Sequence, residues 1–238
     1  IEVKGQFPRT GSNQFIGREV AQAAAERDLV PDDGAPLLMG IDVARFGDDE
    51  SVFRFRRGRD ARSLPPMRYR GVDTMALATH AATAIERLKP DAVFVDGGGV
   101  GGGVVDRLKM LGYRVIEVQS GEAAHDPDKY LNRRAEMWGE MRDWLVYGCI
   151  DNDDSLIDDL TGPEYALHLK GQIKIEGKDA MKKRGLASPD DGDSLALTFA
   201  EPVARNDAAA ARRMNRMRGM VAESSYDIFN SESVAGMQ

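Results

Sequence analysis

Three aspartates in this sequence stand at one end of a hydrophobic element, and carboxylates placed in this way can bind divalent metal ions. Asp42 closes the apolar run at residues 37–41, and Asp96 closes a second apolar run at residues 92–95. Asp193 lies in the first turns of an expected helix. Hard ions such as Mg²⁺ prefer carboxylate oxygens and water as ligands. We therefore predict that these three carboxylates meet and hold two divalent ions, Mg²⁺ or Mn²⁺.

Such a cluster could hydrolyse a phosphodiester. That reaction needs positive charge at both the attacking and the leaving oxygen, which two metal ions about 4 Å apart provide. Each acid also has a simpler explanation, because a lone aspartate at a strand end is commonly a turn residue, and Asp190 and Asp191 suit a helix N-terminus. Asp193 is harder to explain in this way. It lies beside residues that must be buried, where an unpaired charge is costly.

The elements that must position these acids follow from the hydrophobic pattern. Strands are expected at residues 37–43, 50–57, 67–72, 92–95 and 113–118, with helices at 74–89 and 104–111. The unit over residues 91–118 predicts a right-handed parallel crossover. We therefore predict an α/β fold of the ribonuclease H-like type. Its mixed sheet would have antiparallel hairpin strands followed by parallel strands, the first strand at the centre, and helices on both faces.

The second half of the chain is expected to be mainly helical. Helices are predicted at residues 132–147 and 155–161, a hairpin over 165–175, and an irregular basic segment at 179–184. Ser188 is a good N-cap for the acidic helix, with Pro189 at its first helical position. The expected organisation is a linker or docked arm at residues 1–36, a nuclease-type domain at 37–200 and a partly flexible tail at 201–238.

The composition is that of an ordinary globular protein, with 42% hydrophobic and 30% charged residues. No apolar run of about 18 residues exists, so we expect no contact with a membrane. The only cysteine, Cys149, excludes an internal disulfide. A net charge of −7 argues against a general nucleic-acid binder, but residues 51–70 hold seven arginines and one acid, so a local basic surface remains possible.

Basic side chains near the acidic segments could contact DNA phosphates without reading sequence. The alternative is that they form solvated charge runs. The arginines at 54–62 are expected on strand and hairpin, mostly as solvated surface. The candidates for DNA contact are Lys182, Lys183, Arg184, Arg133 and Arg134.

Two nucleotide-binding alternatives stay open. Gly97, Gly99 and Gly102 satisfy the dinucleotide-binding pattern G-x-G-x-x-G between a strand and a helix. However, Asp96 directly precedes them and would repel a pyrophosphate. The run from Gly40 to Asp42 is similar to the first phosphate loop of actin-like ATPases, although bulky residues follow it where small hydroxyl-bearing ones are expected.

The acidic segments together resemble the nuclease domain of the large terminase subunits of tailed bacteriophages. The resemblance covers about residues 1–200 and includes a lead-in at residues 3–8. The matching stretches are residues 39–49, 95–101, 132–138, and Asp190 with residues 193–198. The resemblance implies a ribonuclease H-like, metal-dependent endonuclease that cuts double-stranded, concatemeric viral DNA during genome packaging.

By position, the resemblance makes Asp42, Asp96 and Asp193 the metal-binding and catalytic acids. It implies Asp190 as an auxiliary ligand and Glu136 as a possible nearby acid, and it matches the hairpin over residues 164–176 to one proposed to approach DNA. The implied partners are a terminase ATPase domain, the portal protein and the small terminase subunit, in the host-cell cytoplasm.

One feature departs from the family. The phosphate loop G-x-x-x-x-G-K-[ST] is missing from this sequence, so we expect no ATPase motor in it. A non-catalytic docking module for the portal or capsid is therefore a second hypothesis.

Overall fold

The computed structural model describes residues 13–29, 33–44 and 49–205 of the chain. The lead-in at residues 3–8, part of the matching stretch at 39–49 and most of the predicted tail lie outside these residues. The described residues up to Ala204 belong to one compact unit. Among the helices in these ranges, none has the length and apolar character needed to cross a membrane.

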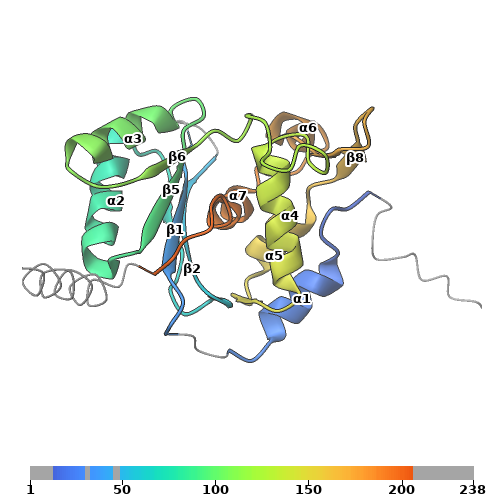
Figure 1. Ribbon diagram of the computed structural model, residues 1–238, viewed down its shortest axis with the longest axis horizontal. Helices are drawn as coiled ribbons and strands as arrows, with labels where there is room; N and C mark the ends of the chain where they lie inside the picture. The colour runs from blue at the N-terminus through green and yellow to red at the C-terminus, as the bar shows by residue number, and fades with distance from the viewer. Residues whose placement is uncertain (1–12, 30–32, 45–48, 206–238) are drawn as a thin grey trace, which may run out of the picture. The chain divides into compact units, whose positions relative to one another are not determined.

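A mixed seven-stranded sheet forms the centre of the fold (Figure 1). Strand β1 (Leu37–Asp42) pairs antiparallel with β2 (Ser51–Arg57) and parallel with β5 (Ala92–Asp96). The predicted central position of the first strand, and the change from antiparallel to parallel pairing, are therefore confirmed. The sheet order is β6-β5-β1-β2-β3-β7, with β4 paired to β2. The shorter strands are β3 (Asp60–Ala61), β4 (Met67–Tyr69), β6 (Ile116–Val118) and β7 (Cys149–Ile150).

Helices cover both faces of the sheet, as predicted (Figure 1). On one face lie α2 (Thr74–Leu88) and α3 (Gly101–Met110), and on the other lies α7 (Asp190–Leu197), which packs against β1 and β2. Helices α4 (Arg133–Leu145) and α5 (Asp154–Thr161) pack on α7, and α1 (Arg18–Glu26) packs on both of them. The acidic helix is therefore enclosed between the sheet and an outer helical layer.

Strand alternation decides which way the two strand-end acids point. Leu38 on β1 and Phe94 on β5 pack in the core that contains α4 and α7, whereas Ile41 packs in the core under α2 and α3. Side chains two residues apart lie on the same face of a strand. Asp42 therefore shares the face of Leu38, and Asp96 shares the face of Phe94. The parallel pairing of the two strands brings both acids to one edge of the sheet, on the side of α7.

The described part of the predicted N-terminal arm contributes to the core. Phe15 and Ile16 are buried, and α1 buries Ala21, Ala24 and Ala25 against the outer helical layer. Small side chains on one helix face let α1 approach α4 and α5 closely. This segment is thus packed on the domain rather than extended as a linker.

Two local predictions were wrong. The segment expected to be irregular, residues 179–184, lies mostly in a short helix, α6 (Lys178–Lys183). It follows the predicted hairpin, which forms as β8 (Tyr165–Leu167) and β9 (Ile173–Ile175). Ser188 does not cap α7, because the helix begins at Asp190 after an N-cap at Pro189, and the buried Ser188 hydroxyl has no hydrogen-bond partner. Another element therefore caps this helix.

Arg54 of β2 differs from the expectation that the arginines at 54–62 are mostly solvated surface. Arg54 is 1% exposed, and its Nε donates to Asp191 Oδ1 at 2.7 Å. Its other end pairs with Asp151, and Arg68 from β4 donates to Asp191 Oδ2 at 2.8 Å. A buried charge is tolerated only when it is paired. These ion pairs tie the N-terminal turn of α7 to β2 and β4.

Asp159 on α5 supplies the missing cap of α7. Its Oδ2 accepts a hydrogen bond from the Asp191 backbone N–H at 3.0 Å, and the Gly192 N–H also donates to its carboxylate. The pKa of Asp159 is raised from the usual 3.8 to about 7, first by burial and then by the charge of Asp191, and the two backbone donors offset only part of this. The cap therefore carries a charge that the fold disfavours near neutral pH.

We predict that Asp159→Asn stabilises the protein above neutral pH. Folding raises the pKa of this carboxyl, so its contribution to stability is full below about pH 4 and is lost as the pH rises through about 7. Asparagine keeps the capping oxygen without the charge. The variant should exceed the unaltered chain in unfolding free energy by on the order of 1–2 kcal/mol at pH 8, and by less toward pH 4. Urea melts at several pH values measure this.

Asp158→Asn is the matched control. Asp158 is the neighbour of Asp159 on α5, but its side chain is 66% exposed and pairs with Arg18 on the surface. Neutralising it should change stability little at any pH in the range. A pH-independent effect of Asp159→Asn would contradict the prediction.

Candidate metal centre

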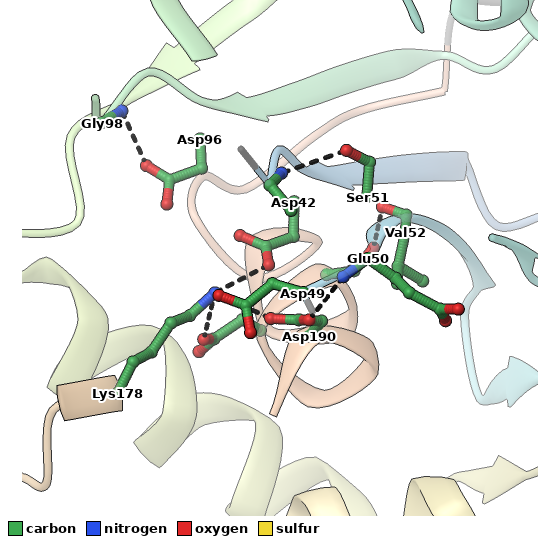
Figure 2. Close-up of polar contacts among 12 residues, drawn as sticks. Asp42, Asp49, Glu50, Ser51, Val52, Asp96, Gly98, Lys178 and Asp190 are labelled. Carbon is green, nitrogen blue, oxygen red and sulfur yellow. Dashed lines mark hydrogen bonds and ion pairs between the residues drawn. The ribbon is translucent and has the colours of Figure 1, made fainter. Parts of the chain in front are cut away.

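Three carboxylates from β1 and α7 surround one ammonium group (Figure 2). Lys178 Nζ lies 2.8 Å from Asp42 Oδ2, 3.1 Å from Asp190 Oδ1 and 3.3 Å from Asp193 Oδ2. The acids are nearly buried, with Asp42 1% and Asp193 8% exposed, whereas the Lys178 side chain is 35% exposed. A cation therefore occupies the point at which buried acids from separate elements converge.

Close contact between β1 and α7 creates this convergence. A Cβ atom on Gly40 would lie 2.0 Å from the backbone oxygen of Ser194, so only glycine permits the approach. The Ser194 hydroxyl, fully buried, lies 3.0 Å from the Gly40 carbonyl oxygen and 2.9 Å from that of Val52, within hydrogen-bond reach of both. Gly40 and Ser194 each sit next to the acidic end of their element. This contact consequently fixes Asp42 and Asp193 relative to each other.

The pKa shifts of Asp42 and Lys178 show that the carboxylates favour a positive charge between them. The pKa of Asp42 is raised to about 7, mainly by burial. The positive charge of Lys178 opposes this rise, and the charges of Asp193 and Asp190 add to it. Burial alone would lower the pKa of Lys178, but the charges of Asp42, Asp193 and Asp190 hold it well above its usual value. The ammonium group is thus firmly protonated, and the carboxylates favour positive charge at this point.

Asp193 has two further partners on α4. Its Oδ1 accepts from Arg134 Nε at 2.9 Å and from Trp138 Nε1 at 2.8 Å. Burial would raise the pKa of Asp193, but the charges of Arg134 and Lys178 and the hydrogen bonds from Arg134 and Trp138 hold it below the usual range. Asp193 is therefore kept ionised inside the protein.

Asp96 stands beside this group rather than within it (Figure 2). Its Oδ1 accepts from the Gly98 backbone N–H at 3.0 Å, and burial raises its pKa. The glycine run allows α3 to start directly behind the strand, because a Cβ on Gly101 would lie 1.8 Å from the Asp96 carbonyl oxygen. The loop N–H of Gly98 thus donates to the Asp96 carboxylate rather than pointing to a phosphate, which weakens the dinucleotide-binding alternative.

The donor set fits a divalent cation, although rearrangement is needed. As the side chains are placed, no group of three His, Cys, Asp or Glu in the described ranges is ready to hold a metal ion. Lys178 accounts for this, since its ammonium lies between the carboxylates and acts as a stand-in cation. Aspartate oxygens are the donors that Mg²⁺ and Mn²⁺ prefer. Binding would require Lys178 to leave and Asp96 to turn inward.

The structure places Glu136 and Arg133 in a separate network. Glu136 accepts from the backbone N–H groups of His125 and Asp126 at 3.0 and 2.8 Å. It also pairs with Arg133 at 2.6 Å. Burial would raise the pKa of Glu136, but these donors hold it below the usual value. Arg133 is buried and donates to the Ala200 carbonyl, and in the described residues neither Glu136 nor Arg133 contacts the three acids.

The other predicted DNA contacts divide into two groups. All three nitrogens of Arg134 are used, because Nη1 donates to the Glu176 carbonyl at 2.6 Å while Nε and Nη2 serve Asp193. Arg184 pairs with Glu176 and Glu164. Lys183 is exposed on α6, and the half-exposed Lys182 pairs with Asp49 at 2.7 Å. Among the predicted DNA contacts, which all lie in the described part of the chain, Lys182 and Lys183 are therefore the two on an exposed helix surface near the site.

Lys178 is the residue that sequence reasoning missed. The available signal was its spacing from Lys182, since residues four apart lie on one face of a helix. Both lysines contact aspartates, Lys178 in the buried group and Lys182 at Asp49. Interpreting this segment as irregular hid that relationship.

Comparison with known proteins gives a consistent result. No protein-family model matches the chain. Over 215 residues it is 26% identical to the "Probable terminase, large subunit" of Enterobacteria phage P7, which covers 84% of this chain and 44% of that protein. The chain thus spans less than half the length of this relative.

Solved structures with the same fold are terminase nuclease domains. The nuclease domain of the large terminase subunit gp2 of bacterial virus Sf6 has a TM-score of 0.70 at 20% identity, covering 79% of this chain and 99% of that one. The large terminase nuclease of thermophilic phage G20c has a TM-score of 0.56 at 16% identity, covering 71% and 83%. This chain therefore has the fold of the terminase nuclease domains and is similar in sequence to a phage large terminase subunit.

Proposed function

We propose that this chain is the metal-dependent endonuclease domain of a DNA-packaging terminase, and that it cleaves double-stranded DNA by phosphodiester hydrolysis. The observation that carries the proposal is the cation held at the convergence of Asp42, Asp190 and Asp193, beside the strand-end carboxylate of Asp96. A hydrolase of this kind needs positive charge on a phosphate, and this group concentrates the acids that recruit it. The fold and the phage relative support the same function.

Metal ions would be held by Asp42, Asp96 and Asp193, with Asp190 as an auxiliary ligand, once Lys178 has moved out. We propose two divalent ions, Mg²⁺ or Mn²⁺. Solved forms of the Sf6 domain contain manganese, and a form of the G20c domain contains magnesium. When bound, two such ions activate a water molecule and stabilise charge on the attacking and leaving oxygens.

The protein's own residues prepare the site. Arg134 and Trp138 keep Asp193 ionised, and the close contact of Gly40 with Ser194 fixes the distance between β1 and α7. The Arg54 and Arg68 pairs hold the first turn of α7. Because these contacts exist before any metal binds, the carboxylates are pre-positioned and less reorganisation is needed.

DNA contacts are proposed for Lys182 and Lys183, which are exposed on α6, about 1.1 and 1.4 turns after Lys178. They would bind backbone phosphates without reading sequence. An ATPase domain, a portal protein and a small terminase subunit are the proposed partners of the whole protein, acting in the host-cell cytoplasm. A docking module without catalysis is the competing function.

Plasmid cleavage tests the proposal directly. The unaltered chain should nick or linearise a plasmid with Mn²⁺ or Mg²⁺ and do neither with EDTA. Asp193→Asn should lower the rate by more than about a hundredfold, since removing only an outer-shell partner of a metal ligand already costs 10–100-fold. Asp106→Asn, at an exposed aspartate of α3, is the matched control and should cleave normally. No cleavage with either metal would favour the docking module.

Asp42→Asn separates catalysis from folding. It should abolish cleavage yet leave the metal-free melting temperature at pH 8 unchanged or higher, because burial disfavours the ionised Asp42 carboxyl. Differential scanning fluorimetry in EDTA measures the melting temperature, and the plasmid assay measures the activity. A large loss of stability would mean that Asp42 has a structural role instead.

Lys178→Ala should improve metal binding and harm the metal-free protein. Without the ammonium, Mn²⁺ affinity should rise roughly tenfold, equivalent to about 1.4 kcal/mol. In EDTA the unpaired acids should cost about 1–3 kcal/mol of stability, less than a fully buried pair because Lys178 is partly exposed. Titration calorimetry and thermal melts measure these quantities. Lys182→Ala, about one turn later, is the control and should change neither the Mn²⁺ affinity nor the stability in EDTA appreciably. Unchanged Mn²⁺ affinity in Lys178→Ala would refute the role of Lys178 as a stand-in cation.

A further inference from the structure

The two oxygens of the Asp193 carboxylate have different surroundings. Oδ1 accepts two hydrogen bonds from α4, from Arg134 Nε at 2.9 Å and from Trp138 Nε1 at 2.8 Å. Oδ2 lies 3.3 Å from both Arg134 Nη2 and Lys178 Nζ. The two short hydrogen bonds are thus both on Oδ1, whereas Oδ2 is directed to the ammonium group of Lys178.

Trp138 is placed for this contact by dense packing. The residue is fully buried, and its ring lies against the backbone of α7 at Gly192, where a Cβ would come within 3.0 Å of the indole. The guanidinium of Arg134 lies 5.5 Å from the ring centroid. Arg134 and Trp138 are four residues apart, so both project from one face of α4. The indole N–H therefore meets Asp193 from a ring that is held on its other sides by the core.

We propose that Trp138 is a positioning residue for the metal site, holding Oδ1 of Asp193 so that Oδ2 is presented to the bound cation. The inference rests on the proposed function and adds a residue that the acidic pattern does not indicate. Metal-binding carboxylates are usually oriented by outer-shell hydrogen bonds, and losing such a partner weakens binding. Without the indole donor, Arg134 alone would orient the carboxylate, whose terminal bond has a broad torsional preference.

The competing explanation is that Trp138 only fills the core. In that case its N–H would merely satisfy a buried acid, and changing it would affect stability but not the metal. Trp144 provides the comparison on the same helix. Its Nε1 donates to the Gly58 carbonyl at 2.9 Å, and its ring packs edge-on against Phe199. The chain has two tryptophans, so replacing either one leaves a single indole reporter.

The test compares Trp138→Phe with Trp144→Phe in the full chain. Free Mn²⁺ is measured by electron paramagnetic resonance, which does not depend on either indole, and folding is followed by circular dichroism. We expect Trp138→Phe to raise the Mn²⁺ Kd about 10–100-fold, and Trp144→Phe to leave it unchanged. A core-filling role would leave the Kd of the folded Trp138→Phe protein unchanged, which would overturn the inference.

A second measurement covers the case in which Trp138→Phe does not fold. In the Trp144→Phe chain, tryptophan emission comes from Trp138 alone. Paramagnetic Mn²⁺ at Oδ2 should quench it saturably, with the Kd found by resonance, and Mg²⁺ should reverse the quenching by competition. Bound Mn²⁺ without quenching would overturn the inference and the assignment of Asp193 as a ligand, whereas metal-dependent plasmid cleavage by the same chain would still support a nuclease. No Mn²⁺ binding by the unaltered chain would instead overturn the proposed function, and this inference with it.

Discussion

Repulsion among buried carboxylates is the constraint on which this structure depends. The first turn of α7 carries three acids, and each is paired with a different cation from a different element. Asp190 meets Lys178 of α6, Asp191 meets Arg54 of β2, and Asp193 meets Arg134 of α4. A helix N-terminus favours negative charge, but it cannot offset the burial of several carboxylates by itself. The packing of α7 between the sheet and α4 therefore requires these pairs.

The pairs differ in how easily they can be exchanged. Arg54 is enclosed within the sheet, and Arg134 uses all of its nitrogens within the protein. Lys178 is partly exposed and stands at the first residue of a six-residue helix. Its ammonium group is held by ion pairs with Asp42, Asp190 and Asp193. The architecture thus combines a rigid set of cations that holds α7 with one cation that a metal ion could replace.

The sequence was informative where local pattern determines structure. Apolar runs ending in aspartate predicted β1 and β5, and strand alternation with parallel pairing then put Asp42 and Asp96 on the same side. The sequence was uninformative where a side chain's role is decided by a contact between segments that are distant in the chain. Nothing near Asp159 indicates that it caps α7, and a strand arginine such as Arg54 gives no sign of a partner 137 residues away. Lys178 belongs to the same class, since its role appears only when α6 is brought beside the ends of β1 and α7.

The arrangement also bears on the docking-module alternative. A docking surface gains from exposed charges that a partner can neutralise, yet Asp42 and Asp193 are nearly inaccessible, and both need a cation from within the protein. Like charges gathered in this way reduce stability unless they bind something small and positive. A protein partner could not enter so enclosed a group, whereas a metal ion could. The cost of burying these acids is therefore more readily explained by cation binding than by docking.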